Sequence, residues 1–175
     1  MSTKKSISIW GFIILVVGVW LTGISSLASA ETMKFKLYTH SAKTERVLIG
    51  DVEGHALALA VRRGIIVFEN GEIGTEISAV INDTIKMSGP LTQYTTITLA
   101  DGSTIIIKIQ GTTSGTAVGS PTAAETTGEI IKGTGRFEGI KGTHIRRVKY
   151  LSVEKGEDAA KGVGEGIITY TLPSK

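Results

Sequence analysis

The segment from Gly128 to Thr143, GEIIKGTGRFEGIKGT, restricts the fold of this chain more than any other stretch. Its glycines alternate with four large apolar residues, Ile130, Ile131, Phe137 and Ile140. Because glycine tolerates positive φ and close backbone approach, this pattern predicts short strands and tight turns. A phosphate-binding loop also clusters glycines, but it needs a helix directly behind it, and residues 146–150 read as a strand. The segment therefore indicates a β-sheet.

Alternation of apolar and polar residues predicts strands along most of the remaining chain. Asn70-Gly71 and Asp101-Gly102 are two-residue hairpin signals between such runs. The expected extended segments are 33–39, 47–51, 55–61 continuing through 65–68, 74–81, 92–100, 103–110, 125–132, 143–153 and 162–172. No run reads as a convincing helix, so the chain is all-β.

Three polar stretches interrupt these strands. Residues 41–46 read as a loop, and 154–161 read as a charged, solvated connection. Gly111 to Ala124 has no large apolar side chain and is long for a loop in a compact domain. We expect it to be either a surface insertion or a mobile flap.

The first 30 residues have the organisation of a signal peptide. Lys4 and Lys5 precede an apolar run from Ile7 to Leu21, and Ala28-Ser29-Ala30 supplies a small-residue cleavage site. We expect cleavage after Ala30, a single domain over 31–175, and secretion or export to a periplasm. The alternative is a retained membrane anchor formed by residues 7–24.

Charge and cysteine content exclude several classes of protein. The chain has 19 Lys plus Arg and 16 Asp plus Glu. Lys4 and Lys5 leave with the leader and no acid does, so 17 minus 16 gives a mature net charge of +1. No basic face suited to nucleic acid is evident, and Arg146-Arg147 reads as an exposed strand pair. Without cysteine the domain has no disulfides, so its stability must come from its core.

Many short strands joined by turn residues are typical of a barrel or a sandwich. Closing the sheet removes edges that such isoleucine-rich strands would otherwise expose to aggregation. We therefore predict a closed antiparallel barrel.

Two segments carry a family resemblance. Residues 131–143 resemble the glycine-rich "GGTGxFxGAxG" segment of the allene oxide cyclase and dirigent-like barrels. Phe35–Tyr38 followed by Ile49–Val52 is similar to the first strand and "GD" segment of the cyclases, in the same order. The resemblance implies a calycin-like barrel of about eight antiparallel strands, and a homo-dimer or homo-trimer.

The chain departs from the cyclases where their chemistry resides. Those enzymes carry Glu and then Asn just after the tyrosine of the first strand, with a Ser-Pro pair shortly beyond. At the matching places this chain has Thr39, Ser41 and the run Lys43–Glu45. A threonine hydroxyl cannot replace a carboxylate that steers charge, so we do not predict allene oxide cyclase activity.

Polar residues in or beside the expected strands are the candidates for a site. The catalytic candidates are Asp51, Glu53 and His55, and the ligand-binding candidates are Tyr38, His55, Tyr94 and Tyr150. The histidines have no metal-ligand spacing, and no nucleophile elbow precedes a helix, so neither a metal site, a cofactor nor a serine hydrolase is predicted.

Three functions remain open at this point. The first is an exported barrel that binds a small apolar or phenolic ligand. The second is a cyclase-type or dirigent-type isomerase that steers a reactive intermediate. The third is a structural barrel with a filled interior. The alternation alone does not say which residues face inward, so it does not decide whether the protein is an enzyme.

Overall fold

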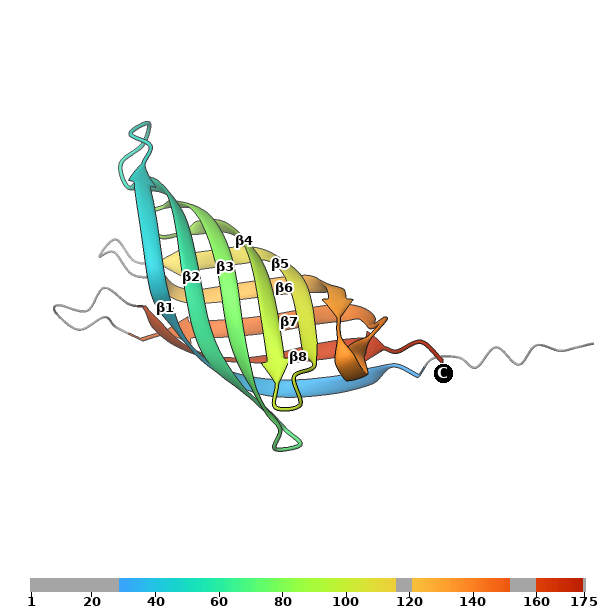
Figure 1. Ribbon diagram of the computed structural model, residues 1–175. Helices are drawn as coiled ribbons and strands as arrows, with labels where there is room; N and C mark the ends of the chain where they lie inside the picture. Colours follow the sequence, from blue (N-terminus) through green and yellow to red (C-terminus); the bar gives the residue numbers. More distant parts are fainter. Residues whose placement is uncertain (1–28, 116–120, 152–159, 175) are drawn as a thin grey trace, which may run out of the picture.

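The computed structural model describes residues 29–115, 121–151 and 160–174. Eight strands close into a barrel in which every neighbouring pair, including β8 and β1, is antiparallel (Figure 1). The elements are β1 (Glu31–Leu48), β2 (His55–Phe68), β3 (Ile73–Ile85), β4 (Gly89–Leu99), β5 (Thr104–Gly115), β6 (Pro121–Gly133), the 3₁₀ turn η1 (Gly135–Phe137), β7 (Lys141–Tyr150) and β8 (Lys161–Thr171). The predicted all-β, closed, antiparallel architecture is confirmed.

Two of the expected loops are strands instead. β1 runs on through residues 41–46, with a register shift between Ser41 and Lys43, and β5 and β6 take up most of 111–124. The polar composition of 111–124 does not prevent strand formation, because threonine is favoured in strands. Thr113 and Ala124 face the interior, where small side chains are sufficient to fill the space. Most of the expected connection 154–161 lies outside the described residues.

Alternation along each strand decides which side chains enter the barrel. Even-numbered residues face inward on β2, β3, β7 and β8, and odd-numbered residues face inward on β4 and β5 and in the first part of β1. Inward glycines make room for large neighbours: a Cβ on Gly166 would lie 2.5 Å from Cζ of Phe35.

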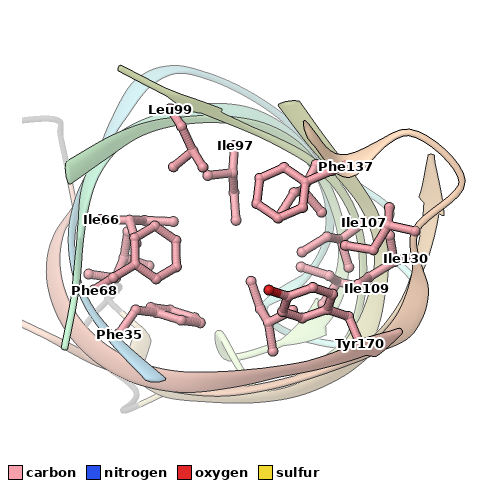
Figure 2. Close-up of a cluster of buried hydrophobic side chains, with 14 of the residues drawn as sticks. Phe35, Ile66, Phe68, Ile97, Leu99, Ile107, Ile109, Ile130, Phe137 and Tyr170 are labelled. Carbon is pink, nitrogen blue, oxygen red and sulfur yellow. The ribbon is translucent and has the colours of Figure 1, made fainter. Parts of the chain in front are cut away.

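The interior has two unlike halves. The half nearest η1, which we call the η1 end, is filled by large apolar side chains, including the ten labelled in Figure 2: Phe35, Ile66, Phe68, Ile97, Leu99, Ile107, Ile109, Ile130, Phe137 and Tyr170. Toward the opposite end a second cluster contains smaller groups, namely Ala60, Val80, Leu91 and Ala124. The buried apolar side chains are therefore larger at the η1 end than toward the opposite end.

The glycine-rich segment closes the η1 end. Gly135 and Gly139 have φ of 62° and 75°, which a glycine adopts readily, and the turn between them carries Phe137 inward onto Tyr170. Arg136 ties the turn to the β2–β3 connection, because its Nη2 donates to both carboxylate oxygens of Glu72 at 2.5 Å. The segment thus contains a 3₁₀ turn between the strands that the sequence predicted.

Among residues 29–115, 121–151 and 160–174, no helix is long and apolar enough to cross a membrane. The predicted leader lies outside these residues except for Ser29 and Ala30.

Candidate functional site

A layer of polar side chains crosses the interior of the barrel between the two apolar clusters. Arg146 on β7 reaches across to β3 and β4. Its Nη1 donates to the two carboxylate oxygens of Glu76 at 3.0 and 3.2 Å, and its Nη2 donates to Oε1 of Gln93 at 2.9 Å. Arg146 is 4% exposed and Glu76 is also buried. The pair is therefore a buried ion pair fixed in its geometry by hydrogen bonds.

Hydroxyl and amide groups on β3 and β4 complete this polar layer. The Ser78 hydroxyl donates to Glu76 at 2.9 Å and lies 2.9 Å from the Thr95 hydroxyl. Nε2 of Gln93 donates to Ser78 at 3.0 Å and to Thr95 at 2.6 Å. Such a network holds a carboxylate and a guanidinium in fixed positions inside a medium of low dielectric.

A second link crosses the barrel from β2 to β7. Nη1 of Arg62 donates to the Tyr150 hydroxyl, and the guanidinium carbon lies 4.7 Å from the centroid of the Tyr150 ring. Arg62 is 8% exposed. Within the described residues no carboxylate forms an ion pair with Arg62, whose positive charge faces a neutral phenol.

His144 lies in the apolar half beside this polar layer. Its ring stacks on Phe35 with centroids 5.7 Å apart and an angle of 17° between the planes. Burial lowers the pKa of His144 to about 3, and the charge of Arg146 contributes to the decrease. The imidazole is therefore neutral at ordinary pH. It is only 2% exposed, so its two ring nitrogens are largely shielded from solvent.

Three buried nitrogens on these inward side chains have no hydrogen-bond partner in the part of the chain that the structure describes. They are Nε of Arg62, Nε of Arg146 and Nδ1 of His144. Buried polar groups in folded proteins are nearly always hydrogen-bonded, so such atoms call for an occupant, either ordered water or a ligand.

The structure separates the predicted tyrosines. Tyr150 faces inward on β7 and contacts both apolar clusters. Tyr38 and Tyr94 face outward and are 54% and 47% exposed, so neither lines the interior. Tyr38 instead lines a groove of about 640 Å³ on the outer wall, together with Ile65, Ile77 and Val163.

Two of the three predicted catalytic candidates, Asp51 and His55, are in contact at the end opposite η1. Nδ1 of His55 lies 2.5 Å from Oδ1 of Asp51, and its Nε2 lies 2.9 Å from Oδ1 of Asp83. Asp83 and Asp51 raise the pKa of His55, and the hydrogen bond to His55 lowers the pKa of Asp51. Since both ring nitrogens lie against carboxylates, His55 links the β1–β2 connection to β3. Glu53 is apart from this link and pairs with Lys86 at 3.5 Å.

Most of the interior polar side chains are not among the residues predicted from the sequence. Arg146 was interpreted as exposed and is buried; Arg147 is exposed, as predicted. The cause is that the two faces of β7 look alike in sequence, with His144, Arg146 and Val148 on one and Ile145, Arg147 and Lys149 on the other. Glu76 was missed because its face of β3 also carries Gly74 and Ser78 while the other face carries isoleucines, a pattern that predicts Glu76 outward.

Among the described residues, no group of histidine and acidic side chains is placed to hold a metal ion.

Comparison with known proteins finds similarity at the level of structure. No protein-family model and no curated protein sequence matches the chain. Among solved structures, it is similar to the pterocarpan synthase dirigent protein GePTS1, with 16% identity, a TM-score of 0.48 and coverage of 84% of this chain and 94% of that one. A second pterocarpan synthase dirigent protein, PsPTS1, gives 17% identity, a TM-score of 0.46 and coverage of 82% and 97%. The chain itself forms the closed antiparallel barrel that the sequence predicts.

Proposed function

We propose that this chain is an exported barrel that binds a small apolar or phenolic molecule in its interior. The observation that carries the proposal is the set of three buried nitrogens, on Arg62, Arg146 and His144, that have no partner within the described part of the chain. All three belong to inward side chains. A barrel that only needed a filled core could place apolar side chains there at lower cost.

The position of the ligand follows from the two halves of the interior. Aromatic and branched side chains occupy the η1 end, and Phe137 packs against Tyr170 there. Toward the opposite end the packed apolar side chains are the smaller Ala60, Val80, Leu91 and Ala124. The ligand would therefore sit between the polar layer and the opposite end, with its apolar part against the smaller side chains.

A second candidate function is the steering of a reactive intermediate. The Glu76–Arg146 pair supports it, because a fixed carboxylate and guanidinium in a dry site can stabilise charge that develops in a reacting molecule. The same barrel would then be an isomerase of the cyclase or dirigent type. Ligand binding is common to both functions, so it is the property to test first.

The proposed location is outside the cytoplasm. It rests on the leader at residues 1–30, with cleavage after Ala30, and on the absence of cysteine from the whole chain. Retention of residues 7–24 as an anchor is the alternative, and the mass of the mature protein distinguishes the two.

The test is native mass spectrometry of the protein purified from its own host without denaturation. We expect a small molecule that copurifies and is lost on unfolding. Ala60→Leu would fill the interior and remove it, whereas Ala79→Leu, on the outward face of β3, would leave it bound. Circular dichroism of both variants separates displacement from misfolding.

A clean apo mass, together with no thermal shift across apolar and phenolic compounds, would refute the proposal. The barrel would then be a structural protein with a filled interior. Turnover of the copurifying molecule, lost on Glu76→Gln with binding retained, would favour the isomerase.

A further inference from the structure

We propose that the ligand carries an anionic oxygen, a carboxylate or a phenolate, which binds Nε of Arg62. This inference rests on the proposed ligand-binding function and defines the chemistry of its ligand. It depends on the charges inside the barrel, on the contacts of Arg62, and on the apolar side chains around it.

The buried charges of the interior do not balance. Among the described residues, three ionised side chains are buried: Arg62, Glu76 and Arg146. Two cations against one anion leave an excess of +1, since His144 is neutral. The Glu76 carboxylate is fully engaged by Arg146 at 3.0 and 3.2 Å and by the Ser78 hydroxyl at 2.9 Å. The excess charge therefore resides on Arg62.

The contacts of Arg62 do not neutralise it. One terminal nitrogen donates to the Tyr150 hydroxyl, and the guanidinium lies over the Tyr150 ring. Nε is buried and has no hydrogen-bond partner among residues 29–115, 121–151 and 160–174. A buried cation without a counter-charge is costly, and such a group is retained where function requires it.

The geometry of a guanidinium indicates what binds. Nε and the adjacent terminal nitrogen form a planar fork that matches the two oxygens of a carboxylate, and a phenolate oxygen can accept from the same fork. Arg146 shows that this barrel can supply an internal carboxylate to a buried arginine. At Arg62 the described residues supply a phenol instead, which leaves the guanidinium open to an anion on the ligand.

The neighbouring side chains define the rest of the ligand. Ala60 precedes Arg62 by two residues on β2 and packs with Val80, Leu91 and Ala124, and Tyr150 packs against this cluster. The ligand is therefore a small apolar molecule with one acidic group, held at its charged end by Arg62 and Tyr150.

The experiment is isothermal titration calorimetry of the purified protein with two matched pairs of probes, at mildly alkaline pH where both acids are ionised. Cinnamate is compared with cinnamamide, and 4-nitrophenolate with 4-nitroanisole. We expect at least one anion to bind about 10-fold to 100-fold more tightly than its neutral analogue. The pair that shows the preference identifies the acidic group as a carboxylate or a phenolate.

Substitutions at single arginines test whether the preference for the anionic probe depends on Arg62. Arg62→Gln should abolish it, and Arg63→Gln, which changes the exposed neighbour, should preserve it. Arg62→Met should leave the melting temperature of the apo protein unchanged or higher, because it removes an uncompensated charge. Arg146→Met should lower it, because it leaves Glu76 unpaired.

Two outcomes separate this inference from the proposed function. If the neutral analogues bind as tightly as the anions, or if Arg62→Gln retains the preference, the anion site is refuted and ligand binding stands. If no probe binds and no molecule copurifies, the proposed function fails and this inference fails with it. A marked loss of apo stability in Arg62→Met would show that Arg62 is a structural group.

Discussion

Acidification should destabilise this barrel through His144, in a pH range where few other groups titrate. The ring is buried against Phe35 and beside Arg146, and its pKa falls from an ordinary value of 6.5 to about 3. In the unfolded chain the ring takes up a proton as pH falls below 6.5, while in the folded chain it does not. The unfolded state therefore binds more protons between these two values, and the free energy of unfolding decreases as pH is lowered.

The magnitude follows from the size of the shift. One pKa unit corresponds to about 1.4 kcal/mol. A decrease from 6.5 to about 3 therefore amounts to a loss of about 5 kcal/mol once pH has fallen below both values. At about pH 5 the loss is about 2 kcal/mol, which is a large part of the stability of a small domain.

The effects of the other titrating groups on stability fall in pH ranges different from that of His144. Asp83 and Asp51 raise the pKa of His55, so its stabilising contribution is complete below 6.5 and is lost only as pH rises through the raised value. The pKa values of Asp51 and Asp101 are lowered from 3.8 and that of Glu45 from 4.5, so the stability that these carboxylates contribute is lost only as pH falls below those ordinary values. The interval between pH 6.5 and the carboxylate range therefore reports His144.

The assay is urea unfolding followed by circular dichroism at a series of pH values, for the wild type and for His144→Phe. The wild type should lose stability across this interval, and the variant should show a much smaller slope. Equal slopes in the two proteins would refute the reasoning, as would an NMR titration in which His144 protonates near its ordinary pKa.

Three further predictions follow from the packing. Glu76→Gln should lower the free energy of unfolding by about 3 to 5 kcal/mol, since it leaves the Arg146 guanidinium buried and unpaired; urea denaturation measures this, and a loss below about 1 kcal/mol would contradict it. Gly128→Ala places a methyl group 2.7 Å from a backbone carbonyl oxygen of β5 and should lower the free energy of unfolding by about 1 to 3 kcal/mol in the same assay. An unchanged free energy of unfolding would show that the backbone of β5 can shift to accommodate the methyl group. Leu59 and Ile81 are cross-strand partners exposed on the outer wall, so the predicted homo-oligomer should dissociate when both become lysine; light scattering that finds a wild-type monomer would remove that prediction.

The fold could be predicted because its signals are local. Asn70-Gly71 and Asp101-Gly102 mark the β2–β3 and β4–β5 turns, and alternation marks the strands between them. The prediction failed at residues 111–124, where small and polar residues hide two strand ends. Their pairing depends on neighbours far along the chain, as when Gly111 lies opposite Thr126, and no local pattern reports such contacts.

The candidate site could not be predicted because it depends on which face of each strand is turned inward. On β7 a shift of one residue would bury Ile145 and Arg147 in place of His144 and Arg146, and both choices have similar hydrophobicity. Closure of the barrel removes the ambiguity by fixing all eight registers together. Tyr38 and Tyr94 illustrate the same limit, since their place on the outer wall follows from Leu37 and Gln93 facing inward.

The glycine-rich segment is connected to the polar layer through β7. The turn at Gly135 and Gly139 places Phe137 in the end of the barrel, and β7 begins two residues after Gly139. This fixes the strand on which His144, Arg146 and Tyr150 face inward. Gly128 lies opposite His144, and Gly166 lies opposite Arg146, so the long side chains meet no Cβ beside them and can extend across the interior. The glycine-rich segment that indicates the fold therefore also helps to position the two contacts that cross the barrel, Arg146 with Glu76 and Arg62 with Tyr150.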